Sequence, residues 1–218
     1  MKEVFPGVYK QKNKVYTKNL IKNNPVYGES IIVIRGQEYR EWNPYRSKLA
    51  AALLKGLKVF PLSSGDNVLY LGAGEGTTAS HIADIVGENG LVFCVDVAPN
   101  VFDKLMGVCE KRRNMIPILG DARKPEEYED IVPEVDVIYQ DVAQPDQVEI
   151  LIRNALKYLK PKGYAFLALK TRSIDVTLEP KAVIEKEKEK LKNHFDILDE
   201  VILDPYEKDH CFFVLRRK

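Results

Sequence analysis

Residues 67–78, Asn-Val-Leu-Tyr-Leu-Gly-Ala-Gly-Glu-Gly-Thr-Thr, constrain the fold of this chain more than any other stretch. An apolar run predicts a buried strand, three alternating glycines follow it, and an amphipathic helix is expected from Thr77. In α/β proteins this order holds the phosphate, ribose or carboxylate groups of a nucleotide-like ligand. The sequence therefore predicts a parallel sheet with a ligand-binding loop that contains Gly72, Ala73 and Gly74.

The spacing of the glycines narrows the class of ligand. The dinucleotide fingerprint Gly-x-Gly-x-x-Gly would need a third glycine at position 77, where this chain has Thr77. Asp96 ends the next apolar run, about 20 residues on, where a carboxylate grips ribose hydroxyls. Alternating glycines with one such acid are more usual for S-adenosylmethionine than for NAD. A glycine-rich turn without a ligand remains the alternative, and an NAD-dependent oxidoreductase is disfavoured.

Composition and charge indicate an ordinary globular protein with a basic beginning. The chain has 218 residues, 45% hydrophobic and 30% charged, and no apolar run of membrane-spanning length or signal-peptide character. We therefore expect a cytoplasmic protein. The first 60 residues carry 12 Lys or Arg against 4 Asp or Glu, whereas the rest carry 21 against 28. This asymmetry suggests a polyanionic partner near the N-terminal part, with a solvated lysine-rich surface as the plainer alternative.

The order of predicted elements divides the chain into two parts. Residues 1–58 are expected to form a small β-rich region, with two hairpins before residue 42 and a linking helix from Pro44 to about Gly56. Residues 59–218 are expected to form a nucleotide-binding domain in which strands and helices alternate. Its strands are predicted at 68–71, 91–95, 115–119, 135–139, 164–169, 196–203 and 211–215, and its helices at 77–86, 101–112, 145–159 and 180–193.

These elements predict an α/β fold with a mostly parallel seven-stranded sheet and helices on both faces. The last two strands are joined by a short loop and must be antiparallel, so the last strand is reversed. This arrangement resembles the class I methyltransferase (Rossmann-like) fold. The three cysteines, Cys94, Cys109 and Cys211, show no metal-binding spacing, and we expect buried, reduced thiols and no metal site.

Three ionisable residues are expected at the ligand-binding edge of this sheet. Asp141 follows the fourth strand, Lys170 ends the fifth, and His210 precedes the reversed last strand. Singly, each has a structural explanation, since Asp141 could cap the next helix and the other two could face solvent. Together they favour a catalytic site. Lys48, in the preceding helix, could cover the same crevice but is the weakest candidate on physical grounds.

Four segments carry a resemblance to a known family. They are Trp42 to Ala52, Val68 to Ala73 together with Gly76-Thr77-Thr78, Asp141-Val142-Ala143-Gln144-Pro145-Asp146-Gln147, and Pro205-Tyr206-Glu207-Lys208-Asp209-His210. Nearly the whole chain resembles fibrillarin, the box C/D RNA 2′-O-methyltransferase. The Gly/Arg-rich extension of eukaryotic members is missing, so the chain is most similar to archaeal fibrillarin-like proteins.

The resemblance implies roles for individual residues. It implies a catalytic group of Lys48, Asp141, Lys170 and His210, and so raises Lys48 from the weakest candidate to a member of the site. It also implies cofactor contacts from Thr77, Thr78, Asp96, Val97, Asp121, Ala122, Asp141, Val142, Ala143 and Gln144. Asp96 departs from the glutamate often found there, but it keeps the carboxylate that a ribose diol requires.

The implied reaction is methylation of an RNA ribose 2′-hydroxyl in rRNA and tRNA, with S-adenosyl-L-methionine as the methyl donor. Lys170 is the favoured residue for accepting the hydroxyl proton or stabilising the developing alkoxide. The implied partners are a box C/D guide RNA, a Nop-family scaffold protein and a kink-turn-binding ribosomal-type protein. Arg35, Arg40, Arg46 and Lys48 could contact RNA phosphates, although such contacts do not read bases. The rival readings are a stand-alone methyltransferase on free RNA, protein or a small molecule, and a non-catalytic assembly subunit.

Overall fold

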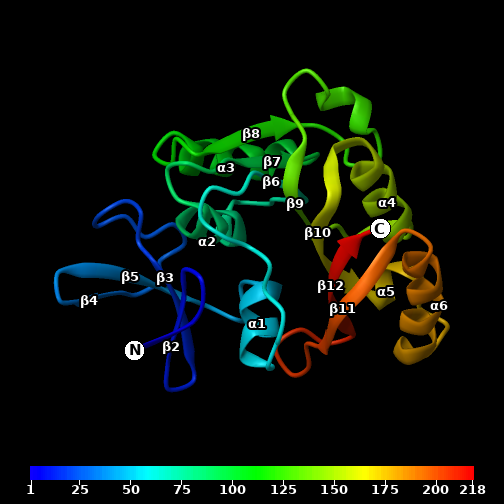
Figure 1. The fold of residues 1–218 in the computed structure, drawn as a ribbon, viewed down its shortest axis with the longest axis horizontal. Coiled ribbons are helices and arrows are strands. Elements are labelled where there is room, and N and C mark those ends of the chain that lie inside the picture. Colours follow the sequence, from blue (N-terminus) through cyan, green and yellow to red (C-terminus); the bar gives the residue numbers. More distant parts are fainter.

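The computed structural model describes residues 1–218 and contains two sheets with separate hydrogen-bond networks (Figure 1). The first is antiparallel, in the order β1-β2-β3-β5-β4, and confirms both predicted hairpins. Its strands are β1 (Lys2–Phe5), β2 (Val8–Gln11), β3 (Lys14–Lys18), β4 (Ile31–Ile34) and β5 (Gln37–Trp42). None of the helices is both long enough and apolar enough to cross a bilayer.

The second sheet has seven strands in the order β11-β12-β10-β9-β6-β7-β8. Strands β6 to β10 are parallel, and β12 is inserted antiparallel between β10 and β11. The strands are β6 (Val68–Leu71), β7 (Val92–Asp96), β8 (Met115–Leu119), β9 (Val135–Gln140), β10 (Leu159–Lys170), β11 (Phe195–Ile202) and β12 (His210–Arg217). The predicted fold class, a mostly parallel sheet with a reversed last strand, is confirmed.

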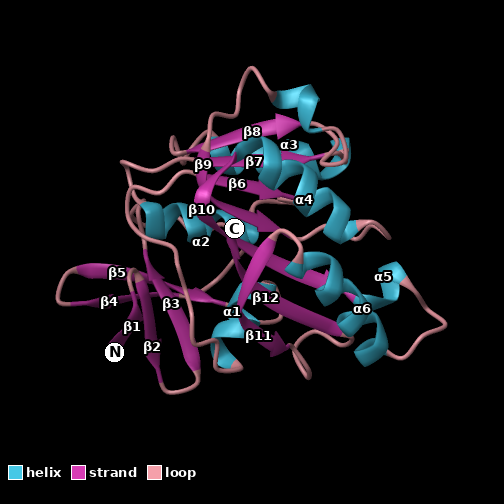
Figure 2. Ribbon diagram, turned by 45° about the vertical axis from the view of Figure 1, so that its right-hand side comes forward, coloured by secondary structure: helices cyan, strands magenta, loops and turns pink.

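Helices cover both faces of this sheet (Figure 2). They are α1 (Lys48–Leu54), α2 (Thr77–Val86), α3 (Pro99–Cys109), the 3₁₀ turn η1 (Pro125–Tyr128), α4 (Gln147–Tyr158), α5 (Thr171–Ile174) and α6 (Pro180–Lys192). Alternate strand residues feed two hydrophobic cores. Val68 and Tyr70 lie in the core with α1, α2 and α3, whereas Leu69 and Leu71 lie in the core with α4 and α6.

The arrangement of helices places a crevice at the centre of the sheet. The chain leaves β6 for α2 on one face and leaves the adjacent strand β9 for α4 on the other. Ligands of open α/β sheets bind where neighbouring strands diverge in this way, outside their carboxyl ends. The expected ligand edge is therefore the edge at which β6, β7, β9 and β10 end.

Helix α1 begins later than predicted. Pro44 does not start it, because the Asn43 side chain accepts a hydrogen bond from the Tyr45 amide (2.9 Å) and the Arg46 amide donates to the Asn43 carbonyl (3.1 Å), which forms a turn. Ser47 is the N-cap and accepts a bond from the Ala50 amide (3.4 Å). As a result, Lys48 is the first residue of the helix.

The N-terminal sheet packs directly on the larger sheet's helices. Val8, Val15 and Trp42 belong to the same buried cluster as Ala79 and Ile82 of α2. The division at residues 58 and 59 stays a prediction about domains, since one core joins the two parts. The three cysteines are buried and free, as expected.

Candidate functional site

The loop after β6 lies against the end of β9. Gly72 has a φ of +79°, and a Cβ there would lie 2.4 Å from the Asp141 carbonyl oxygen, so only glycine permits this approach. Gly76 is the N-cap of α2 with a φ of +87° and provides no side-chain cap. The first amides of α2 are therefore left without a capping side chain at the ligand edge of the sheet.

Asp96, the last residue of β7, is held by this loop. Its carboxylate accepts a hydrogen bond from the Gly74 amide (2.7 Å) and another from the Ala98 amide (3.0 Å). Two backbone bonds fix the carboxylate at the carboxyl end of β7, next to the glycine loop. A carboxylate has about four acceptor sites, so lone pairs remain for a ribose diol.

A cavity of about 290 Å³ opens beside this carboxylate. That is near the lower end of the range typical of ligand sites. It brings together ten of the predicted cofactor residues: Gly72, Gly74, Asp96, Val97, Asp121, Ala122, Asp141, Val142, Ala143 and Gln144. Val95, Gly120, Arg123 and Ile150 complete the lining and were not predicted. Val95 and Gly120 could have been predicted, because both lie at the carboxyl ends of predicted strands.

Asp121 lies in the loop after β8 and is kept ionised by a neighbour. The Arg123 guanidinium donates to it (2.7 Å), and this hydrogen bond lowers the pKa of the Asp121 carboxyl. The cavity thus holds two oriented carboxylates, Asp96 and Asp121, on successive strand ends. Such a pair suits the hydroxyl and amino donors of a nucleoside.

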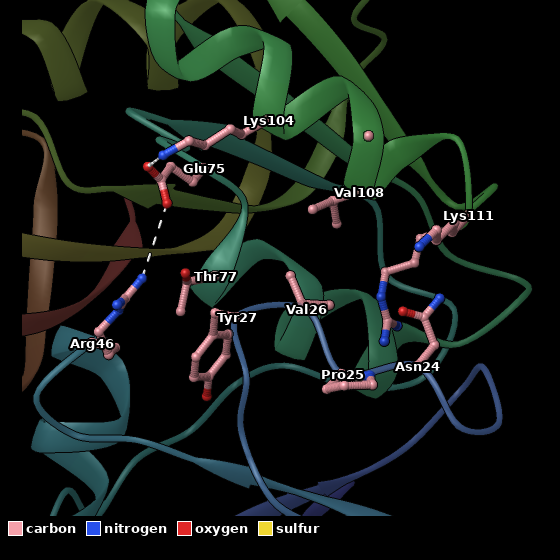
Figure 3. Close-up of a pocket in the computed structure, with 12 residues that line it drawn as sticks. Asn24, Pro25, Val26, Tyr27, Arg46, Glu75, Thr77, Lys104, Val108 and Lys111 are labelled. Atoms are coloured by element: carbon pink, nitrogen blue, oxygen red, sulfur yellow. Dashed lines mark hydrogen bonds and ion pairs between the residues drawn. The ribbon is translucent and has the colours of Figure 1, made fainter.

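Three predicted cofactor residues do not line this cavity. Ala73 is buried in the hydrophobic core, and the Thr78 hydroxyl donates to the Ser47 hydroxyl (2.8 Å). Thr77 lines a separate cleft of about 430 Å³ between the 24–27 segment and α3 (Figure 3). In that cleft Lys104 and Arg46 both approach the Glu75 carboxylate, which lies 4.0 Å from Arg46 (Figure 3).

Lys48 and Asp141 form the first half of the predicted catalytic group. Lys48 Nζ lies 2.9 Å from Asp141 Oδ2, and both side chains are about one-fifth exposed. The start of α1 is thereby bound to the end of β9. The Asp141 carboxylate is engaged by this lysine, and the cap of α4 is Asp146, so the capping alternative for Asp141 does not hold.

Lys170 and His210 form the second half. They are directly opposite each other on the antiparallel strands β10 and β12, which places both at the same sheet edge. The buried Gln147 side chain accepts from the Lys170 amide (3.0 Å) and donates to the Lys170 carbonyl (3.1 Å). Gln147 was not predicted to support the site. Its position inside the Asp141–Gln147 segment was the only available signal.

His210 is neutral in this setting. Burial lowers the pKa of the imidazole, and nearby Lys48 lowers it further. Nδ1 lies 2.7 Å from the Lys208 carbonyl oxygen, an acceptor, so Nδ1 carries the hydrogen. In the neutral ring Nε2 is then a free acceptor.

Of the three arginines predicted to contact phosphates, Arg40 is unavailable, whereas Arg35 and Arg46 are exposed. Arg40 is fully buried and pairs with Glu29 (2.6 Å) and Asp84 (2.7 Å), so it is a structural residue. Arg35 lies in the β4–β5 turn with a φ of +51°. Arg46 is exposed and lies two residues before Lys48.

Comparison with known proteins agrees with this geometry. The fibrillarin family model matches residues 1–218. The chain is 51% identical to the fibrillarin-like rRNA/tRNA 2′-O-methyltransferase of Pyrococcus abyssi, covering 99% of this chain and 97% of that protein. Aeropyrum pernix fibrillarin, solved with natively bound S-adenosyl-L-methionine, has 51% identity and a TM-score of 0.86 over 93% of this chain and 88% of that one.

A fibrillarin/Nop5p complex has also been solved, and its fibrillarin is 44% identical with a TM-score of 0.92 over the full length of both chains. Both the family model and this match span the whole chain. This chain belongs to the fibrillarin family.

Proposed function

We propose that this chain is an S-adenosyl-L-methionine-dependent RNA ribose 2′-O-methyltransferase that acts on rRNA and tRNA as the catalytic subunit of a guide-RNA particle. The observation that carries the proposal is the position of Asp141. Asp141 lines the 290 Å³ cavity, and its carboxylate binds Lys48. A cofactor site and an ionisable group able to handle a hydroxyl proton therefore meet at one residue.

The cavity suits S-adenosyl-L-methionine, which supplies an activated methyl group when bound. Asp96 would hold the ribose diol, because its carboxylate is fixed at the end of β7 and keeps free lone pairs. Asp121 would accept from an adenine amino group, and Val97 and Ala122 provide apolar contacts. Relatives named as methyltransferases and a relative solved with this cofactor support the assignment.

The four residues of the predicted catalytic group, at the same edge of the sheet, would position and deprotonate the second substrate. A neutral 2′-hydroxyl is a weak nucleophile until a nearby group takes its proton or stabilises the alkoxide. Asp141, held by Lys48, would orient the hydroxyl, and Lys170 would stabilise the developing negative charge. Neutral His210, with Nε2 free, offers a further acceptor. Positioning by these four groups supplies much of the acceleration.

A Nop-family protein is the best-supported partner, because a related chain has been solved with Nop5p. We extend the proposal to a box C/D guide RNA and a kink-turn-binding ribosomal-type protein. The exposed cations near the site include Arg123 in the cavity lining and Arg46 and Lys104 in the neighbouring cleft. Such contacts position a phosphate backbone but do not read bases, so target choice must come from a guide.

The test is a methyl-transfer assay with purified full-length protein, with and without guide RNA and scaffold protein. The modified nucleotide is then mapped in the target RNA. We expect a 2′-O-methyl group at one guided position and little or no methylation of naked RNA. Site-specific turnover by the isolated protein would favour a stand-alone methyltransferase. Cofactor binding without turnover in the complete particle would favour a non-catalytic assembly subunit.

A further inference from the structure

Tyr45 is the only exposed aromatic residue of this chain. Its side chain is 66% exposed, whereas the other 19 aromatic residues are buried or partly buried. Tyrosine is enriched among the residues that carry the binding energy of interfaces, and aromatic side chains stack on exposed bases of RNA. Tyr45 is therefore a candidate contact residue, and the surroundings of its ring decide whether it can serve as one.

The Tyr45 ring rests on a second ring that is anchored to the core. It meets Tyr206 edge to face, with ring centroids 5.2 Å apart, and Tyr206 packs against the main hydrophobic cluster. The Asn43 side chain also binds the Tyr45 amide, which fixes the backbone. One side of the ring is thus packed against the protein while most of its surface is exposed to solvent, as expected of a contact residue.

Each of the two rings lies in a segment that also contains a residue of the predicted catalytic group. Tyr45 lies three residues before Lys48, and Tyr206 lies four residues before His210. Three residues of chain span at most about 10 Å, so the backbone of Tyr45 lies within that distance of the backbone of Lys48. Arg46, the next residue, approaches Glu75 in the neighbouring cleft (Figure 3), so an exposed cation follows the ring in the segment that leads to Lys48.

We propose that Tyr45 is a substrate-positioning residue whose ring packs into the minor groove of the target RNA beside the reacting ribose. The proposal rests on the proposed function. In A-form RNA the 2′-hydroxyls line a wide, shallow minor groove, so a protein that reaches one of them must approach that groove. An aromatic ring beside the reacting group then packs on the sugars and base edges of the neighbouring nucleotides.

The test uses the reconstituted particle of full-length protein, scaffold protein, guide RNA and target RNA. Tyr45→Ala should raise the target concentration for half-maximal methylation by roughly 5- to 30-fold, the effect of losing one aromatic contact. Tyr45→Phe keeps the ring and should have the half-maximal target concentration of the wild-type protein. Tyr39→Ala is the matched control, because Tyr39 forms a similar edge-to-face pair with Tyr9 (5.0 Å) on the N-terminal sheet. Cofactor affinity, measured by calorimetry, should not change in any of these variants.

A crosslinking experiment identifies what the ring touches. With Tyr45 replaced by photoreactive p-benzoylphenylalanine, crosslinks should map to the target strand within about two nucleotides of the methylated position. Crosslinks to the scaffold protein, or an unchanged half-maximal concentration for Tyr45→Ala, would overturn the inference. In contrast, failure of the wild-type particle to methylate any target would count against the proposed function, so the two failures are distinguishable.

Discussion

Lys48 Nζ lies 2.9 Å from Asp141 Oδ2, although 93 residues separate the two in the chain. This ion pair joins the first residue of α1 to the loop after β9. Because α1 directly follows the N-terminal sheet in the chain, the ion pair links the segment after that sheet to the cofactor-binding edge of the larger sheet. Of the two predicted catalytic lysines, Lys48 is therefore engaged in an ion pair. The structure records no ion pair for the other, Lys170.

Lys170→Ala should reduce methyl transfer by about 10²- to 10⁴-fold, the usual contribution of a positioned proton-transfer or charge-stabilising group. Cofactor affinity should stay nearly intact, because Lys170 does not line the 290 Å³ cavity. Single-turnover methylation in the particle and calorimetric titration of the cofactor check the two parts. Lys162→Ala is the control, since Lys162 is an exposed lysine in the same strand, toward its opposite end. Retained turnover in Lys170→Ala would exclude the assignment.

Asp96→Ala should weaken cofactor binding before it affects anything else. The carboxylate binds the Gly74 and Ala98 amides, so its loss removes a ligand group and releases the glycine loop. Hydrogen bonds to a charged group contribute about 1.5–3 kcal/mol, so Kd should rise roughly 10- to 150-fold. Calorimetry measures the change, and thermal melting without cofactor checks that the fold persists. An unchanged Kd would place the ribose elsewhere.

The sequence allowed accurate prediction wherever local pattern and topology determined the outcome. β6 and α2 have the predicted bounds, because a fully apolar run meets glycines and then a helical periodicity. Lys170 and His210 come together because parallel strands share an edge and a reversed strand begins there. Neither conclusion required knowledge of side-chain contacts.

The remaining features depend on contacts between distant segments. Arg40 was expected to face RNA, but it is buried with Asp84, a partner 44 residues away on α2. The start of α1 was misplaced because Pro44 favours a first helical turn, while Asn43 and Ser47 together place the start at Lys48. The support that Gln147 gives to Lys170 is likewise visible only in the fold.

Methylation should decline in acid, at a pH below the ordinary histidine pKa of about 6.5. The pKa of His210 in the fold is lowered by burial and by Lys48, so the imidazole is neutral at pH 7 and gains a proton only in acid. Protonation would remove the free Nε2 acceptor and add a cation beside Lys48. At a pH between the folded and the unfolded pKa of His210, the unfolded state binds more protons than the folded state. The free energy of unfolding therefore decreases as the pH is lowered through this interval.

The check is a pH–rate profile of the particle compared with that of His210→Gln. The variant should be slower at pH 7 and should lack the acidic limb that belongs to His210. The charged groups that act on the imidazole, Lys48, Glu207 and Asp141, are present in both proteins, so they do not account for a difference between the two profiles. Identical profiles in the two proteins would show that His210 does not control the rate.

Gly72→Ala should damage the site through backbone contact. A Cβ at Gly72 would lie 2.4 Å from the Asp141 carbonyl, so β9 and the loop must separate. Overpacking of this kind costs about 1–3 kcal/mol in folding stability, beyond the strain of a positive φ. Gly56→Ala is the matched control, because Gly56 has a φ of +96° with no atom within 4 Å of the added Cβ. Denaturant unfolding should show the larger loss for Gly72→Ala, accompanied by weaker cofactor binding; equal losses would contradict the close approach.

Asp84→Ala should be the most destabilising of these substitutions. The Asp84 carboxylate is fully buried and binds Arg40 of β5 (2.7 Å), Arg112 after α3 and the Thr17 hydroxyl (3.0 Å). Its loss leaves two guanidinium groups buried with one remaining carboxylate, Glu29, and breaking a buried pair costs about 3–5 kcal/mol. Asp196→Ala, which removes an exposed pair with Arg216 (2.8 Å), should cost less than about 1 kcal/mol. Because Asp84 joins the N-terminal sheet to α2 and α3, hydrogen exchange in Asp84→Ala should rise first in residues 1–42. Unaltered protection there would mean that the hydrophobic contacts of Val8, Val15 and Trp42 hold the two parts together without this ion network.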